Sequence, residues 1–123
     1  MAGKVQPSSD RKQRYRRGHT AEFMAAAFLM ARGYRILARR YKSAAGEVDL
    51  ITLKSGRVGF VEVKRRATLI ECESSITPKL RQRVRDASDL WFARNVRYQG
   101  YDIGFDIVFV MPWRMPVFLK DAL

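Results

Sequence analysis

The sequence predicts an α/β fold in which a mixed sheet is flanked by helices, with the core order α-β-β-β-α-β. Two observations lead to this prediction. An apolar helical segment near the N-terminus is followed by three strand-like runs that are separated by short turns. An amphipathic helical segment then precedes a fourth strand-like run, which can lie parallel to its neighbour by a right-handed crossover because a helix connects them.

The first helix is predicted over residues 18–32. Alanine, phenylalanine, leucine and methionine fill its interior, and Gly33 stands where a left-handed cap is favoured. Because the helix is apolar almost all round, we expect it to be buried. Residues 1–17 have few apolar side chains and contain the basic run RKQRYRR, so we expect a disordered basic arm there and one folded domain over residues 18–123.

Three strands are predicted next, at residues 34–40, 47–53 and 58–64. The segments between them contain the turn-forming runs SAAG and KSG. Because loops this short can join only neighbouring strands that run in opposite directions, we expect an antiparallel meander.

The second helix has a clear start, since Thr77 is a fitting N-cap and Pro78 a fitting first-turn residue. The residues before it, around Cys72, are expected to be a linker. The fourth strand is predicted at residues 102–110, and residues 117–119 can add an edge strand after two prolines. One face of the helix is apolar and is expected to rest on the sheet, through Leu80, Val84, Ala87 and Trp91.

Lysine and arginine total 24 against 12 aspartate and glutamate residues, which gives a formal net charge of +12 and a pI near 10.6. Such a charge favours contact with a polyanion, and nucleic acid is the first candidate. An anionic membrane surface is the second, but the most hydrophobic helix lacks the basic polar face that this would need. A solvated basic surface without a polyanionic partner is the remaining alternative.

Several classes of protein are disfavoured by what the sequence lacks. The one cysteine, Cys72, cannot close an intrachain disulfide, which suits a reducing, cytoplasmic setting. The longest apolar stretch, residues 23–31, is far too short to span a bilayer, so no membrane partner is expected. The single histidine, His19, leaves no material for a histidine-rich metal site or a histidine-based triad.

The run VGFVEVKRR at residues 58–66 places a glutamate and a lysine two positions apart in an apolar strand. Side chains in a strand alternate with period 2, so Glu62 and Lys64 share one face of the sheet. Asp49 lies in the preceding strand, and paired strands lie about 4.8 Å apart, so the two carboxylates can meet. Carboxylates this close repel each other and resist desolvation, so positive charge is needed between them.

Lys64 supplies one positive charge, and a hard divalent cation such as Mg²⁺ would supply the rest. Such a metal activates water for attack on a phosphodiester, while Lys64 could orient that water or stabilise the developing charge. The alternative is that Glu62 and Lys64 form an ordinary same-face ion pair and that Asp49 is a surface acid near a turn. Glu22 favours the site, because it is the one acid in an otherwise apolar helix and a buried carboxylate needs a partner.

From about Gly18 to the C-terminus, the chain resembles the bacterial YraN-like family of uncharacterised proteins. The similarity is carried, in this order, by GHTAEFMAAAFLMARGYRILARR, GEVDLI, FVEVKRR and FDIVFV. That family is placed in the restriction-endonuclease-like, PD-(D/E)XK superfamily, whose core has the same α-β-β-β-α-β order and is similar to that of Holliday-junction resolvases. The chain departs from the family pattern at Ala21, Arg40 and Ala45, where glycine, asparagine and glycine are usual, and these departures concern local turn geometry.

The resemblance implies that residues 18–123 are a nuclease-like domain with Asp49 and Glu62 as metal ligands. It also implies the backbone carbonyl of Val63 as a further ligand, assistance from Glu22 directly or through water, and a catalytic role for Lys64. The implied activity is Mg²⁺- or Mn²⁺-dependent endonuclease cleavage of DNA, branched or damaged, by a metal-activated water. The alternatives are a nucleic-acid-binding module without catalysis in a repair or recombination complex, and a basic adaptor for another protein. A homodimer would suit a two-strand substrate.

Several other residues have two readings. Asp106, in the last strand, is expected to pair with an arginine rather than to serve the site. Trp113, between two prolines, is either an exposed stacking or docking residue or an ordinary packed aromatic. Six basic residues could line a phosphate track beside the site, although a solvated face explains each of them singly: Arg17, Arg65, Arg66, Lys79, Arg81 and Arg85.

Overall fold

The structure is a computed structural model that describes residues 9–123, with side chains from residue 19 onward. Among the residues described, no helix is both long and apolar enough to cross a membrane. The elements follow in the order α1 (Ser9–Ala31), β1 (Arg35–Ser43), β2 (Gly46–Lys54), β3 (Arg57–Arg65), α2 (Leu69–Ser74), α3 (Pro78–Arg94), the 3₁₀ helix η1 (Val96–Tyr98), β4 (Asp102–Val110) and β5 (Val117–Leu119).

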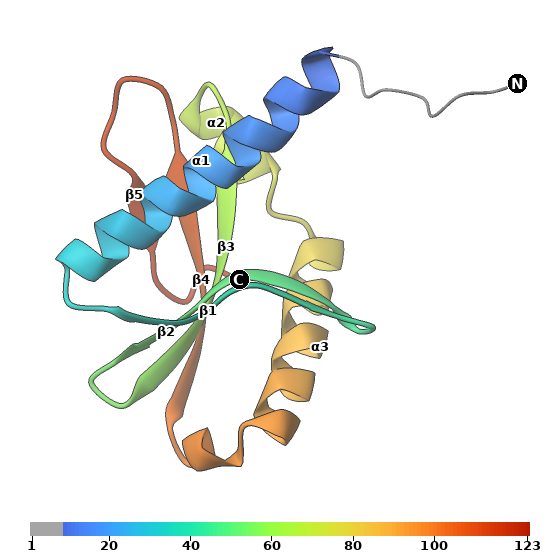
Figure 1. The fold of residues 1–123 in the computed structure, drawn as a ribbon, viewed down its shortest axis with the longest axis vertical. Helices are drawn as coiled ribbons and strands as arrows, with labels where there is room; N and C mark the ends of the chain where they lie inside the picture. The colour runs from blue at the N-terminus through green and yellow to red at the C-terminus, as the bar shows by residue number, and fades with distance from the viewer. Residues whose placement is uncertain (1–8) are drawn as a thin grey trace, which may run out of the picture.

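The strands form one sheet in the order β1-β2-β3-β4-β5 (Figure 1). Strands β1, β2 and β3 are an antiparallel meander, and β4 returns through α3 to lie parallel to β3, with Phe105 beside Phe60. The edge strand β5 pairs antiparallel with β4. The predicted mixed sheet, the crossover and the edge strand are therefore confirmed, and the element order is that of a restriction-endonuclease-like core.

Helices cover both faces of this sheet (Figure 1). Helix α3 packs on one face, where Trp91 meets Phe60 edge to face with 5.7 Å between ring centroids. Trp91 is buried, as predicted. Helix α1 crosses the other face and packs over Leu50 and Val61.

Helix α1 begins at Ser9, so residues 9–17, which we expected to belong to a disordered arm, form its first turns. Arginine, lysine and glutamine in this stretch are good helix formers, and they extend a helix that the following apolar segment already holds against the sheet. Residues 1–8 of the expected arm lie outside the residues that the structure describes.

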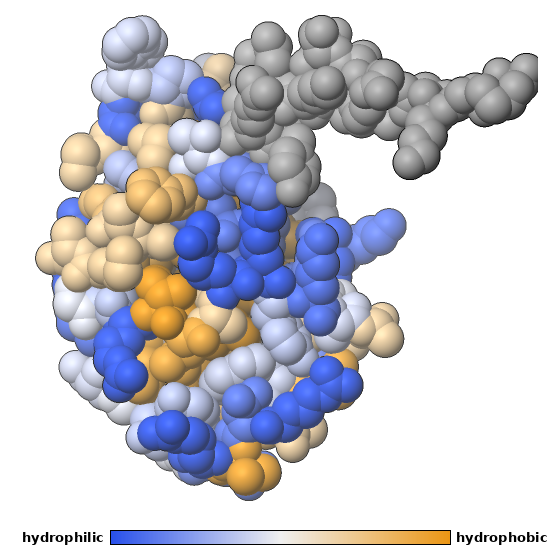
Figure 2. Space-filling model, viewed as in Figure 1, coloured by the Kyte–Doolittle hydropathy of each residue, from blue (hydrophilic) through white to orange (hydrophobic). Residues whose placement is uncertain are grey.

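The expectation that α1 is buried on almost every side is wrong. Ala25 and Leu29 are buried, but Phe23 is 62% exposed and Met24 and Met30 are also exposed. The reason is geometric, since one sheet face lies under the helix and can cover only one side of it. Figure 2 looks onto this side and shows hydrophobic residues on the left of the molecule, where the C-terminal half of α1 lies in Figure 1.

The expected linker contains a short helix, α2. The hydroxyl oxygen of Thr68 accepts a hydrogen bond from the Glu71 N–H at 3.2 Å, and the Glu71 carboxylate accepts one from the Ala67 N–H at 3.0 Å. The T-x-x-E capping signal for this start was present in the sequence. At the start of α3 the predicted cap is confirmed, because the Thr77 hydroxyl accepts from the Leu80 N–H at 3.1 Å.

A buried ion pair ties β3 to β4 and to the C-terminal segment. Arg57 donates to the two carboxylate oxygens of Asp106 at 2.9 and 2.6 Å and to the carboxylate of Asp121 at 2.8 Å. Asp106 is fully buried, so the arginine partner predicted for it is confirmed and meets the cost of its desolvation. The Arg57 guanidinium lies against Gly104, where a Cβ atom would collide with it.

Gly104→Ala is therefore expected to destabilise the fold by roughly 2–4 kcal/mol, because displacing the guanidinium leaves the Asp106 carboxylate buried without its partner. Chemical denaturation measures the change in the free energy of unfolding. Asp121→Asn is the matched control, since Asp121 is largely exposed and its loss leaves the Arg57–Asp106 pair in place. A Gly104→Ala protein as stable as the control would contradict this account.

Candidate functional site

The site lies where β2 and β3 separate. The paired register of these strands ends with Leu50 opposite Val61, so Asp49 and Glu62 are the next residues on the two strands. The Asp49 carboxylate accepts a hydrogen bond from the Val63 N–H at 2.8 Å, which fixes it against the backbone of β3. Asp49 and Glu62 are therefore neighbours across β2 and β3, and the charge of Asp49 acts on Glu62.

Glu62 is 5% exposed, and the Lys64 ammonium lies 3.3 Å from its carboxylate. Burial, and next the negative charge of Asp49, raise the pKa of Glu62 to about 7, although Lys64 and Arg83 act in the opposite direction. The two carboxylates are therefore short of positive charge near neutral pH. Lys64 alone does not hold Glu62 fully ionised.

The pKa of Asp49 is raised as well. Burial is the main cause, and the negative charge of Glu22 adds to it, whereas the hydrogen bond from Val63 and the charge of Lys64 lower the pKa. Glu22 thus stands close enough to Asp49 to act on it, which connects α1 electrostatically to the pair on the sheet.

Glu22 itself is buried, and two arginines of β1 bind it. Its carboxylate oxygens accept from Arg40 Nε at 2.6 Å and from Arg39 Nε at 3.3 Å. The predicted need for a partner is met by these arginines. Both oxygens are engaged, so Glu22 is oriented by β1 in this arrangement.

Sequence reasoning missed three arginines around the site: Arg39 and Arg40 on β1, and Arg83 on α3. Arg40 lies across from Asp49, because the register pairs Arg39 with Leu50 and Tyr41 with Val48 on either side. It adopts φ 53°, a conformation that asparagine tolerates better than arginine. The departure from the family pattern at this position was the one available signal that an unusual backbone stands beside the site.

Gly46, at the tip of the β1–β2 hairpin, explains how Arg83 comes near. A Cβ atom at Gly46 would stand 2.8 Å from the Arg83 carbonyl oxygen and 2.6 Å from its Cγ, so the hairpin tip packs directly on α3. This close approach needs a glycine. It brings the Arg83 charge near enough to Glu62 to lower the pKa of that carboxyl.

The donor set suits a hard divalent cation. Among residues 19–123, whose side chains are described, no three histidine, cysteine, aspartate or glutamate side chains form a metal-sized cluster. Asp49 and Glu62 are a pair of carboxylates, and Mg²⁺ is commonly held by one or two carboxylates together with waters and substrate phosphates. The pair therefore fits Mg²⁺ or Mn²⁺ better than a metal that requires a closed protein cage.

The basic residues predicted to line a phosphate track fall into different settings. Arg65, Arg66, Lys79 and Arg81 are exposed. Arg85 differs, because it donates to the Leu123 carbonyl at 3.2 Å and its guanidinium lies over the Phe105 ring at 4.4 Å, so it packs the C-terminus onto α3. Arg17 belongs to α1, but its side chain is outside the described set.

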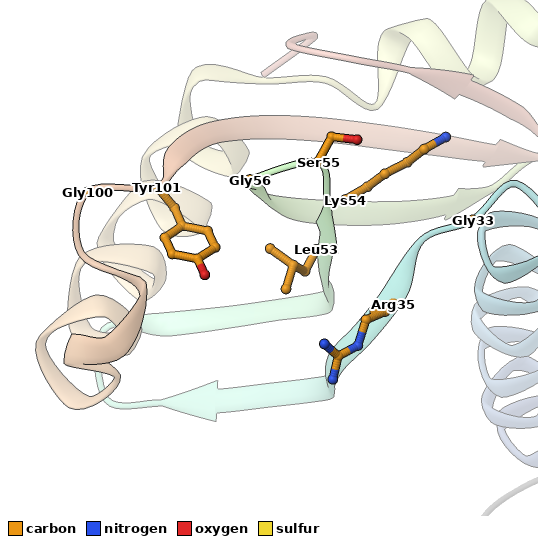
Figure 3. Close-up of a pocket in the computed structure, with 8 residues that line it drawn as sticks. All are labelled: Gly33, Arg35, Leu53, Lys54, Ser55, Gly56, Gly100 and Tyr101. Atoms are coloured by element: carbon orange, nitrogen blue, oxygen red, sulfur yellow. The ribbon is translucent and has the colours of Figure 1, made fainter.

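One open groove of about 660 Å³ lies away from the carboxylates (Figure 3). Leu53 and Tyr101 face each other in it, and Arg35 and Lys54 point to different sides. It opens at the β2–β3 turn, about 17 Å along β2 from Asp49. This groove therefore does not form part of the candidate site.

The model of a family described as "Uncharacterised protein family UPF0102" matches residues 21–110. A UPF0102 protein of Mesorhizobium japonicum is 46% identical over 116 residues, covering 94% of this chain and 93% of the relative. UPF0102 proteins of Rhizobium meliloti and Agrobacterium fabrum are 41% and 42% identical, each with 94% of this chain covered and with 95% and 94% of the relative.

The chain belongs to the UPF0102 family. This confirms the YraN-like resemblance of the sequence. The matched UPF0102 segment begins at Ala21 and ends at Val110, so it contains Glu22, the Asp49–Glu62 pair and Lys64.

In this UPF0102 protein, Glu62→Gln is expected to raise stability at pH 8 but not at pH 5. The pKa of Glu62 is about 7 in the folded state against an ordinary value of 4.5, so the folded state loses stability as pH rises from about 4.5 to 7. A neutral glutamine avoids that loss, which is about 3 kcal/mol. Thermal unfolding at both pH values, with metal removed by chelation, measures the difference.

Glu73→Gln, at an exposed position of α2, is the control for the loss of one negative charge. Two results would show that burial does not raise the pKa of Glu62 as described. One is an equal effect of the two substitutions, and the other is a Glu62→Gln protein that, relative to the native chain, is less stable at pH 8 than at pH 5.

Proposed function

We propose that this protein is a metal-dependent nuclease that cleaves phosphodiester bonds of DNA. The observation that carries the proposal is the Asp49–Glu62 pair, in which Glu62 is buried and Asp49 partly buried, with the Lys64 ammonium close to Glu62, in a chain of net charge +12. Buried carboxylates with raised pKa values, close to a lysine, are typical of sites with a chemical task. A strongly basic chain is suited to a polyanionic substrate.

The residues have distinct roles in this proposal. Asp49, held by the Val63 N–H, and Glu62 would bind Mg²⁺ or Mn²⁺, and the Val63 carbonyl is a further candidate ligand. A bound divalent cation supplies a Lewis acid that neutralises phosphoryl charge and lowers the pKa of water. Lys64 places a positive charge beside the reacting phosphate, where it stabilises the negative charge that develops.

Glu22 is best assigned a positioning role. Its carboxylate binds Arg39 and Arg40, so it fixes two guanidinium groups beside Asp49. Arginine guanidinium groups match phosphate geometry, and Arg40 is only partly buried, so the pair can serve a substrate phosphate while Glu22 holds it in place. A homodimer, which would suit a two-strand substrate, stays a prediction.

A second candidate is a nucleic-acid-binding module without catalysis. Two observations favour it: arginines neutralise Glu22, and no cluster of three potential metal ligands exists among the described side chains. Such a module would bind nucleic acid through the basic surface with steep salt dependence, and would need no metal.

Cleavage of end-labelled DNA tests the first proposal against the second. Single-stranded, duplex, flapped and four-way-junction substrates are incubated with Mg²⁺, with Mn²⁺ and with chelator. We expect metal-dependent products whose rate falls roughly a hundredfold or more in Glu62→Gln and in Lys64→Ala, since each removes a group at the reacting phosphate.

Arg94→Gln, an exposed residue in the last turn of α3, is the matched control and should cleave at the native rate. Tight, salt-dependent binding without products from any substrate, equal in all four proteins, would favour the binding module. Products that persist in Glu62→Gln would point to a contaminating nuclease.

A further inference from the structure

A small pocket lies between α1 and the loop that joins β4 to β5. Its volume is about 200 Å³, which is below the 300–1,000 Å³ typical of pockets for drug-sized ligands. It therefore suits one ring system rather than a larger molecule. The residues that line it are Thr20, Ala21, Met24, Arg65, Val110, Met111, Pro112, Trp113 and Arg114.

The lining separates into an apolar floor and a basic rim. Ala21, Val110 and Met111 are buried and apolar, whereas Arg65 and Arg114 are exposed. None of the described residues that line the pocket is acidic. A ligand that is flat and apolar on one part and anionic on the other matches this arrangement, and a nucleotide has these two parts.

Trp113 is the most unusual residue of the pocket. Its side chain is 102% exposed, so packing does not explain it, and no described residue forms a ring contact with it. Its φ is 62°, which is strained for a bulky residue. Prolines at 112 and 116 restrict the loop that holds it. Strained, exposed aromatic residues in restrained loops are found where a ligand supplies the missing contact.

The pocket adjoins the candidate site on two elements. Arg65 follows Lys64 on β3, and Ala21 precedes Glu22 on α1. Arg65 lies about 10 Å along β3 from Glu62, from three strand rises, and because side chains alternate it faces the α1 side of the sheet, opposite to Glu62 and Lys64. Through Ala21 the pocket also adjoins Glu22, whose charge acts on Asp49, so a strand that reaches the Asp49–Glu62 pair can present a base to the pocket within several nucleotides of the reacting phosphate, because successive bases on one strand rise 3.4 Å.

We propose that this pocket binds one unpaired base of the substrate, with Trp113 as the stacking platform and with Arg65 and Arg114 at the flanking phosphates. The inference rests on the proposed function and specifies its substrate: nucleic acid with unpaired nucleotides next to the cleavage point, such as a flap, fork or junction. Bases inside an intact duplex are stacked on one another and do not present a free face to Trp113.

Binding experiments in chelator separate this inference from catalysis. The chain has two tryptophans, and Trp91 is buried against Phe60 and Tyr98, so a change in fluorescence on binding reports on the exposed Trp113. We expect an oligothymidylate to quench the tryptophan fluorescence of the native protein. The Trp113→Phe variant should lose this quenching but bind the oligothymidylate within a fewfold of the native affinity.

Trp113→Ala is expected to weaken binding of oligothymidylate and of a flapped duplex by roughly five- to a hundredfold, and to leave blunt duplex affinity unchanged. Arg114→Gln should weaken binding of all three DNAs. It should also reduce the slope of log K against log salt concentration by about the share of one phosphate contact. The matched controls are Tyr101→Ala, an exposed aromatic in the groove at the β2–β3 turn, and Arg94→Gln.

The outcomes separate the two proposals. The pocket inference is overturned if Trp113→Ala binds single strands as tightly as the native protein does and the native fluorescence does not change on binding. In that case the nuclease proposal stands. If Trp113 behaves as expected but no substrate is cleaved, the base site stands and the nuclease proposal fails. A Trp113 signal with anionic phospholipid vesicles and none with any oligonucleotide would overturn the inference in favour of a membrane surface.

Discussion

The electrostatic repulsion between Asp49 and Glu62 is the constraint on which the rest of the site depends. Two carboxylates meet at the point where β2 and β3 separate, and both have raised pKa values because of burial. A fold that needed only stability would place apolar side chains there, since replacing buried charges by well-packed apolar groups is often neutral or stabilising. The free energy lost by placing two carboxylates there is consistent with a site that is complete only when a cation is added.

Three basic residues, each on a different element, bring positive charge to the site. Lys64 comes from β3 itself, Arg83 comes from α3 because Gly46 lets the β1–β2 hairpin rest on that helix, and Arg40 comes from β1. Glu22 of α1 holds Arg40 and at the same time adds negative charge near Asp49. The site thus combines negative charges on α1, β2 and β3 with positive charges on β1, β3 and α3. The ion pair of Arg57 with Asp106 has a separate role, since it fixes β3 against β4 away from these charges.

Much of this could be predicted from the sequence because it depends on local periodicity. Period 2 in residues 58–64 placed Glu62 and Lys64 together, the short turn before them placed Asp49 opposite, and Thr77 with Pro78 placed the start of α3. The missed helix α2 had a local signal as well, in the T-x-x-E capping pattern. The metal roles of these residues are implied by resemblance and remain predictions.

The other features depend on tertiary packing and have little local signal. An apolar circumference could not show that α1 would leave Phe23 and Met30 exposed, because that depends on how many layers cover it. The two arginines bound to Glu22 lie on β1, and neither charge nor spacing identifies them without the register. The exposure of Trp113 likewise depends on the path of the loop after β4.

The most direct test of the central claim is calorimetric titration of Mn²⁺ into the native protein and Glu62→Gln at pH 7, in two buffers that differ in ionisation enthalpy. The account predicts saturable Mn²⁺ binding with release of protons by the native protein, because Glu62, with a pKa of about 7, must lose its proton before it can bind a cation. Glu62→Gln is predicted to bind Mn²⁺ at least tenfold more weakly and without that proton release. Equal titrations of the two proteins, or no saturable binding by the native chain, would contradict the claim that the paired carboxylates form a cation site.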